Sequence, residues 1–184
     1  TNLSELSEIT MPPTTPTEWE AARDDFVAQW GALGSHWGIN RTMAQIHALL
    51  MTAPEPMYTD EIMEKLQISR GNANTNLREL VGWGLIQIIH RKGERKEFFQ
   101  AEKDVWKMVI TIAKERKRRE IMPALEVLKS CAERTKAESK GPGREFHQQM
   151  KELQEFVEFG IKVSDTISSM KHASALQWAM KLLG

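Results

Sequence analysis

A run of amide, hydroxyl and basic side chains at residues 69–78 carries the clearest chemistry in the sequence. If this run is helical, at about 100° per residue, one face collects the apolar residues Ala73, Leu77, Leu80 and Val81. The opposite face presents Gly71, Asn72, Thr75 and Arg78, with Asn74 and Asn76 at its flanks, and the predicted DNA-binding set also includes Ser69 and Arg70 at the start of the run. An Asn amide can pair with adenine and an Arg with guanine, and a Gly lets the backbone approach a base edge or a phosphate. This face therefore has the groups needed to read DNA in a groove.

Four cations surround a glycine shortly after this run. They are Arg91, Lys92, Arg95 and Lys96, and Gly93 lies between them. The flanking residues 85–90 and 96–100 are rich in β-branched and aromatic side chains, which favour strands. We expect a β-hairpin whose tip places the cations on phosphates or in a minor groove.

Two short helices must position these groups. Thr59 or Asp60 can cap a first helix that carries Ile62, Met63 and Leu66, and Ser69 can cap the second after a turn at residues 67–68. A helix, a turn, a polar helix and a basic hairpin then follow in the order of a winged helix-turn-helix. Each feature alone also occurs on ordinary solvated surfaces, so only their conjunction favours DNA binding. We predict a mainly α fold with a small β-hairpin wing.

The charge distribution fits this prediction although the net charge of the chain is zero. Residues 69–96 hold six basic and two acidic side chains, a local charge of +4, whereas residues 1–30 hold one basic and six acidic ones, a charge of −5. DNA responds to the local basic face rather than to the total.

The N-terminal part supplies two further helices. Thr17 with Glu20 three residues later forms a capping box, and the helix that follows carries one apolar stripe of Trp19, Ala22, Phe26, Trp30 and Leu33. Gly34 and Gly38 are expected to interrupt it. Asn40 can cap the next helix, which Pro54 and Pro56 end.

A long helical region makes up the C-terminal part. A helix from about Asp104 leads into the cationic run 114–119 and then meets Pro123, which should kink or restart it. The cationic run could extend a DNA footprint, or it could be a solvated face paired with Glu115 and Glu120. Both readings stay open.

The apolar stripes predict a homodimer. After the break at residues 141–143, apolar residues recur at four-three spacing, and one helix cannot cover that surface alone. The predicted dimer contacts are Trp19, Phe26, Phe146, Met150, Leu153, Val157, Ile161 and Ile167. We expect three parts: a flexible arm at 1–17, a winged helix-turn-helix domain with the first dimerisation helix at 18–102, and a helical dimerisation region at 103–184. A second subunit would place two recognition helices about 34 Å apart.

The chain contains several short motifs in a fixed order, namely Trp30-Gly31, Trp37-Gly38-Ile39-Asn40-Arg41, Asp60-Glu61-Ile62, Ile68-Ser69-Arg70-Gly71-Asn72, Leu77-Arg78-Glu79-Leu80, Trp83-Gly84-Leu85 and Gly93-Glu94-Arg95-Lys96. In these motifs the sequence resembles the GbsR branch of the MarR-type transcriptional regulators. The resemblance covers about residues 18–122. It implies a homodimeric winged helix-turn-helix repressor or regulator, often controlled by a small ligand, with residues 69–78 in the major groove and Arg95 in the minor groove. Many such wings hold an Asp two residues before that Arg, where this chain has Gly93.

An effector site is a further expectation. Trp30, Trp37, Tyr58, Trp83 and Trp106 could line an apolar pocket, although Trp at helical spacing is more often part of a core. Aromatic faces can hold a quaternary ammonium group. Only the resemblance, some of whose members respond to choline-like compounds, points to that chemistry.

The sequence lacks the residue patterns that are typical of catalytic sites and metal-binding sites. The histidines are scattered without a His-x-x-x-His pair, and there is no glycine-rich phosphate loop. The lone Cys131 cannot form an internal disulfide or a thiolate metal site, and it could be either a redox sensor or, more often, a small packing residue. We expect no enzyme activity and no cofactor. No apolar run suits a membrane span or a secretory signal, which predicts a cytoplasmic protein.

Two other function classes remain. A winged helix can serve as a protein-docking module, in which case binding would depend little on salt. A purely structural helical dimer would leave the outward polar groups of residues 69–78 without a role.

Overall fold

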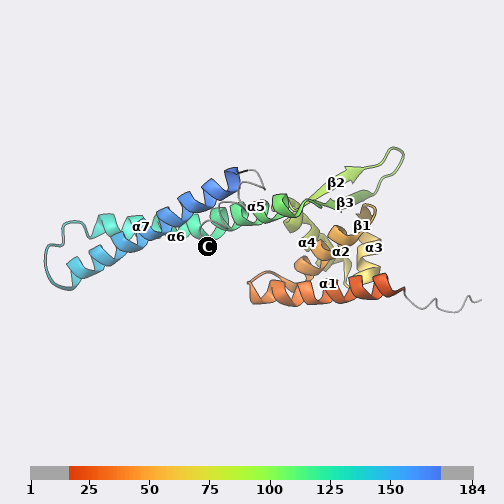
Figure 1. Ribbon diagram of the computed structural model, residues 1–184, viewed down its shortest axis with the longest axis horizontal. Helices are drawn as coiled ribbons and strands as arrows, with labels where there is room; N and C mark the ends of the chain where they lie inside the picture. The colour runs from red at the N-terminus through yellow and green to blue at the C-terminus, as the bar shows by residue number, and fades with distance from the viewer. Residues whose placement is uncertain (1–16, 171–184) are drawn as a thin grey trace, which may run out of the picture. The chain divides into compact units, whose positions relative to one another are not determined.

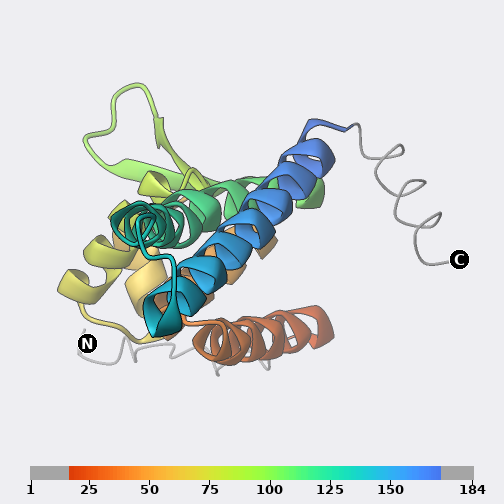
Figure 2. The same cartoon turned by 90° about the vertical axis from the view of Figure 1, so that its left-hand side faces the viewer.

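The computed structural model describes residues 17–170, which form two compact units. The first comprises residues 17–79 and 88–100, and the second comprises residues 80–87 and 101–170. Of the arm expected at residues 1–17, all but Thr17 lie outside the described residues, as do residues 171–184. Figures 1 and 2 show the described helices and strands in two perpendicular views.

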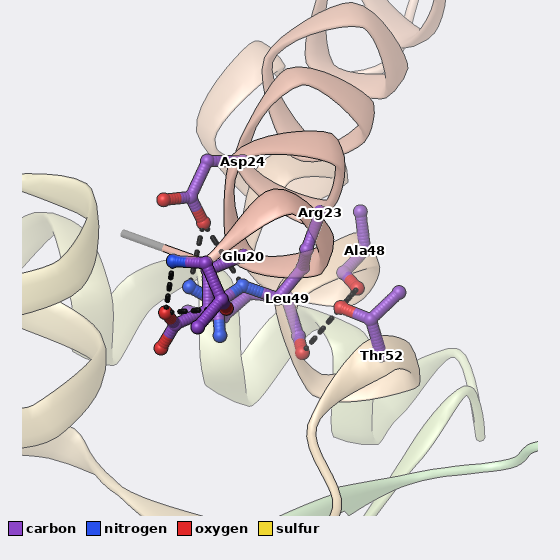
Figure 3. A network of polar contacts seen from close by, with 7 residues as sticks. Glu20, Arg23, Asp24, Ala48, Leu49 and Thr52 are labelled. Carbon is purple, nitrogen blue, oxygen red and sulfur yellow. Dashed lines mark hydrogen bonds and ion pairs between the residues drawn. The ribbon is translucent and has the colours of Figure 1, made fainter. Parts of the chain in front are cut away.

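In the first unit, helix α1 (Glu18–His36) starts at the predicted cap. The backbone N–H and the hydroxyl of Thr17 both donate to Oε2 of Glu20, at 2.9 and 2.7 Å. The first bond gives a partner to the N–H of the cap residue, which the helix itself leaves without one. Both bonds favour the charged carboxylate and lower the pKa of the Glu20 carboxyl. One turn on, Arg23 donates twice to Asp24 (Figure 3).

Helix α2 (Arg41–Thr52) packs against α1 through small residues. Asn40 caps it as predicted, because its Oδ1 accepts from the Met43 N–H at 3.1 Å. At its other end, the Thr52 hydroxyl donates to the carbonyls of Ala48 and Leu49 (Figure 3).

The prediction that Gly34 interrupts α1 is wrong, since the helix continues to His36, and the chain turns after it at Gly38, where φ is +73°. Gly34 is buried, and a Cβ added there would lie 2.6 Å from the Cβ of Ala44 in α2. The glycine therefore allows the two helices to approach closely. Val27 and Gly31 complete the buried face of α1. The predicted stripe instead contains Trp19 and Leu33, which are exposed.

Gly34→Ala should destabilise the fold although Ala is the better helix former. The added methyl group must move a backbone, because its neighbour Ala44 has no flexible side chain to yield, and overpacking of this kind costs about 1–3 kcal/mol. The propensity gain of about 1 kcal/mol does not offset that cost. Urea unfolding would measure the change in the free energy of unfolding. Gly71→Ala is the matched control, since a Cβ at Gly71 meets no atom within 4 Å. Equal stability of the two variants would contradict the close-approach role.

The largest fully buried side chains include Ile46, Leu50, Ile62 and Leu77, which place the core of the first unit among α2, α3 and α4. His47 of α2 is also buried, and within residues 17–170 its Nε2 has no hydrogen-bond partner. Burial disfavours the charged imidazolium and lowers the pKa of His47 to about 4.

His47 should make stability fall in mild acid. The folded-state pKa lies below the usual histidine value of 6.5, so the unfolded chain binds more protons between these two values. Stability is then full above about pH 6.5 and declines as pH falls toward 4, by about 2 kcal/mol at pH 5. Urea unfolding at pH 7.5 and pH 5 would show the decline. His47→Leu should flatten it, and an unchanged slope in that variant would assign the effect to other groups.

Helices α3 (Thr59–Leu66) and α4 (Arg70–Gly82) form the helix-turn-helix. The cap of α3 lies one residue earlier than predicted, since Thr59 is already helical and the Tyr58 N–H donates to Glu61. Gln67 makes the turn in the left-handed conformation, with φ at 52°. The N–H groups of Gln67 and Ile68 both donate to the Met63 carbonyl, which closes α3. Ser69 caps α4 as predicted, accepting from the Asn72 N–H at 3.3 Å.

The sheet has three strands in the order β1-β3-β2, namely β1 (Met57–Tyr58), β2 (Ile86–His90) and β3 (Glu97–Ala101). The β2–β3 hairpin confirms the predicted wing (Figure 1). Strand β1 was not predicted. It pairs antiparallel with β3, with Met57 opposite Phe99 and Tyr58 opposite Phe98.

The second unit consists mainly of α5 (Val105–Arg116), η1 (Lys117–Ile121), α6 (Met122–Arg134) and α7 (Gly141–Ser169). Asp104 caps α5, accepting from the N–H groups of Trp106 and Lys107. Helices α6 and α7 lie side by side in both views (Figures 1 and 2).

Pro123 does not stop the helix, because the chain passes it through a π turn at η1. The Met122 N–H donates to the carbonyl of Lys117, five residues back, instead of four. The wider turn makes room for the proline ring near the preceding carbonyls. Residues 105–134 therefore stay helical, with one extra residue wound into the turn.

Candidate nucleic-acid interface

The outward face of α4 holds the predicted polar residues together. Ser69, Arg70, Gly71, Asn72, Asn74, Thr75 and Arg78 are all exposed. The predicted inward residues Ala73, Leu77 and Leu80 are buried, and Val81 is half-buried. Asn76, which was expected at the flank, is only 4% exposed.

Two members of this face have partners inside the first unit. Arg70 forms an ion pair with Asp60 of α3, which ties the start of α4 to the preceding helix. Asn72 bonds to Thr42 of α2 and to Asn76 one turn along α4. Sequence reasoning missed both because these contacts link residues that are distant in sequence or depend on burial.

The wing tip is a tight turn. The Glu94 N–H donates to the Arg91 carbonyl at 3.1 Å, and Gly93 takes a φ of +86°, which a glycine adopts without strain. A Cβ at Gly93 would meet no atom within 4 Å, so conformation rather than space calls for glycine there. Lys92 and Arg95 are exposed on this turn.

Two other wing cations lie over aromatic rings. The Arg91 guanidinium carbon is 4.3 Å from the centre of the Phe98 ring, and its Nη2 is 3.7 Å from a carboxylate oxygen of Glu55. Lys96 Nζ is 3.9 Å from the centre of the Tyr58 ring. Cation–π contacts and a carboxylate therefore hold both side chains at the base of the wing.

The two rings also contact each other. Tyr58 and Phe98 are cross-strand neighbours of β1 and β3, and their rings meet edge to face with centres 5.8 Å apart. Such aromatic pairs stabilise a sheet by about 0.5–1.5 kcal/mol beyond the area they bury. The pair links β1 to the wing strand β3 and carries both cations.

The cations thus fall into two groups. Arg91, Lys96 and Arg70 contact carboxylates or rings within the first unit. In the part of the chain that the structure describes, Arg78, Lys92 and Arg95 show no hydrogen bond, ion pair or ring contact, and all three are exposed. Their charges are available to an anionic partner.

The five aromatic residues predicted for a ligand pocket are divided between the two units. In the first unit, Trp30 packs on Phe26 with ring centres 5.4 Å apart, Trp37 is exposed after α1, and Tyr58 lies at the wing base. In the second unit, Trp83 is buried under the guanidinium of Arg119, and Trp106 is half-buried at the start of α5.

Sequence reasoning missed a hollow of about 220 Å³ in the first unit. Apolar groups of Leu49, Pro54 and Met57 line it, together with the charged side chains of Arg23, Glu61 and Lys65. The lining combines apolar groups with both signs of charge, which suits a small amphipathic molecule.

The cationic run of the second unit is largely neutralised by carboxylates. Glu115 accepts from Arg118 and Arg119, Arg116 pairs with Glu120, and Lys117 pairs with Asp165 of α7. The hydrogen bond from Arg118 lowers the pKa of the Glu115 carboxyl and raises that of the Arg118 guanidinium. These ion pairs favour the interpretation of residues 114–119 as a solvated helix face over the interpretation as an extension of the DNA footprint.

The predicted dimer residues on α7 are incompletely covered. Phe146 and Leu153 are exposed, and Met150, Val157, Ile161 and Ile167 are half-buried. On α1, Trp19 is exposed and Phe26 half-buried. Two further apolar residues of α7 were missed, Phe156 at 74% and Phe159 at 64% exposure. At about 100° per residue, both lie outside the four-three stripe formed by Phe146, Met150, Leu153 and Val157.

Other sites have little support among residues 17–170. This part of the chain holds no group of three or more His, Cys, Asp or Glu placed to bind a metal, and Cys131 is a half-buried free thiol in α6. None of its helices combines the length and the apolar character that crossing a bilayer needs.

The chain resembles known regulators in part of its sequence and in its fold. No protein-family model matches it. The HTH-type transcriptional repressor GbsR of Bacillus subtilis (strain 168) is 30% identical over 88 residues, 48% of this chain and 48% of that protein. The match therefore spans about half the length of this relative. A crystal structure of a transcriptional regulator covers 80% of this chain and 95% of its own, with a TM-score of 0.63 and 17% identity. This structural likeness shows that the chain has a winged helix-turn-helix fold.

Proposed function

We propose that this protein is a sequence-specific, double-stranded DNA-binding transcriptional regulator. The observation that carries the proposal is the polar face of α4 and the basic wing turn within one compact unit. Arg78, Lys92 and Arg95 are exposed there, and the described residues offer them no counter-charge. The partial likeness to a transcriptional repressor supports the same class of function.

In this proposal α4 enters the major groove. Arg78 can donate two hydrogen bonds to guanine O6 and N7, and Asn74 and Thr75 can reach neighbouring base edges. The wing lies along the adjacent backbone, with Arg95 at the minor groove and Lys92 on phosphates. Arg91 and Lys96 act as positioning residues, because their ring contacts hold the wing at a fixed angle.

The active form in this proposal is a homodimer. Exposed aromatic residues on α1 and α7 leave apolar surface that water contacts in a single chain, and a second copy is the occupant that such matching surfaces suit. A dimer of this kind places two recognition helices about 34 Å apart on a pseudo-palindromic site.

Repression and control by a small ligand are the finer parts of the proposal. A dimer bound over a promoter excludes polymerase, and the partial relative is a repressor by name. A quaternary ammonium compound is the effector chemistry that the resemblance implies, with choline as its simplest probe. Tryptophan fluorescence during a choline titration would test it, since the chain holds six tryptophans. A flat titration would remove this effector from the proposal.

Fluorescence anisotropy with a random duplex at two salt concentrations tests the proposal directly. Phosphate contacts release counterions, so affinity should fall steeply between about 50 and 200 mM salt. Selection of bound duplexes from a random pool should then yield a palindrome. A protein-docking module or a structural dimer would bind no duplex at either salt concentration, and this result would overturn the proposal.

A further inference from the structure

A hydrogen-bond network fixes the side chain of Asn72 on the exposed face of α4. The buried Asn76 donates from its Nδ2 to two oxygens of Asn72, the backbone carbonyl at 2.8 Å and the side-chain Oδ1 at 2.6 Å. The Asn72 amide nitrogen in turn donates to the hydroxyl of Thr42 in α2, at 3.4 Å.

The backbone carbonyl determines which way both amides point. A carbonyl only accepts, so the group of Asn76 that faces it must be the NH2 group. The same NH2 group faces the side chain of Asn72, which must therefore present its oxygen inward. This assignment follows from the hydrogen bonds and leaves Nδ2 of Asn72 toward Thr42 and the surface.

Asn72 consequently directs one polar group outward. Its Oδ1 is engaged by Asn76, which is 4% exposed and lies on the inner side of α4. Of the two N–H bonds on Nδ2, Thr42 accepts one, and the other has no partner within residues 17–170. Pairing with adenine needs an outward donor and an outward acceptor together, and this side chain shows only the donor.

We propose that Asn72 is a donor-only contact to DNA, and that Asn76 and Thr42 are the positioning residues that set its polarity. The contact rests on the proposed function. Its partner is a hydrogen-bond acceptor without an adjacent donor, either guanine O6 or N7 and thymine O4 on a base edge, or a phosphate oxygen. The sequence-based expectation that Asn72 pairs with adenine through two bonds is thereby replaced.

The fixed amide can be tested without DNA. NMR should show the side-chain amide protons of Asn76 exchanging with water at least about tenfold more slowly than those of Asn74, because Asn76 is buried and doubly bonded. Asn74, exposed on the same helix, is the matched control. Equal exchange rates in the two side chains would overturn the inference whatever the protein binds.

The polarity is tested by Asn72→Asp with Asn74→Asp as the charge-matched control. Asn72→Asp keeps an oxygen for Asn76 but turns the outward donor into a charged acceptor. It should weaken binding to the selected duplex at least about tenfold more than Asn74→Asp, since an acceptor then faces an acceptor. Equal losses in the two variants would overturn the donor assignment.

Selection of bound duplexes from a random pool by the Asn72→Ala variant distinguishes a base edge from a phosphate as the acceptor. Lost preference for guanine or thymine at one position assigns a base edge, whereas weaker binding with an unchanged site assigns a phosphate. Lost preference for adenine over guanine would instead mean a two-point contact and would overturn the inference. If the wild-type chain binds no duplex, the proposed function fails together with the DNA contact, while slow Asn76 exchange would still establish the fixed amide.

Discussion

Replacing Lys92 and Arg95 together by Ala should weaken binding to every duplex by about 100-fold and lower the salt slope by about 2. Both side chains are exposed on the wing turn and have no partner among the described residues. Their removal therefore costs one phosphate contact and one cation in the negative potential of the minor groove, without breaking an internal contact. Anisotropy titrations over a salt series would measure both quantities.

The matched control for the wing is Lys136→Ala in the second unit. Lys136 is similarly exposed and pairs only weakly, with Glu133 at 3.6 Å. Its loss should leave affinity and salt slope within about twofold of the wild-type values, because a surface ion pair contributes little. If the two sets of variants lose affinity equally, the effect is one of overall charge, and the wing has no special role.

The double variant Phe156→Glu, Phe159→Glu should convert the dimer to a monomer and remove high-affinity binding to a palindromic duplex. Two exposed aromatic rings per subunit would each gain about 1.5–3 kcal/mol on burial in a partner. Carboxylates in the same place would add the cost of burying unpaired charge. We expect a dimer dissociation constant at least about 1000-fold higher, measured by analytical ultracentrifugation.

Ser130→Glu in α6 separates the interface from a general effect of acidic residues. Ser130 is exposed and lies outside the two helices that carry the predicted contacts, so this variant should stay dimeric at the same concentration. A wild-type chain that is already monomeric would contradict the dimer directly. Circular dichroism before sedimentation would show that both variants remain helical.

Sequence signals located the elements well where the physics is local. The predicted caps at Thr17, Asn40 and Ser69 each rest on one side chain that accepts a nearby N–H group or bonds to a residue three positions on, and the structure contains all three. The wing followed from β-branched runs around a glycine. These features depend on a few consecutive residues, so the sequence alone carries them.

Features that depend on a partner element could not be predicted in this way. Strand β1 has only two residues and exists because β3 pairs with it. Gly34 looked like a helix break because nothing in the sequence places Ala44 beside it. Asn76 was expected at the surface, and its burial alone turns Asn72 from a two-point reader into a donor.

The π turn at η1 sets the angular phase between the two halves of a continuous rod. One additional residue per turn rotates everything beyond it by about 100°. In a regular α-helix running from α5 through α6, the residues of α6 would face directions about 100° away from those that they face here. The π turn therefore determines which side of α6 contacts α7. Deleting one residue from 117–121 would restore the regular count, and with it turn the α6–α7 hairpin about the rod axis by roughly a quarter of a revolution or more.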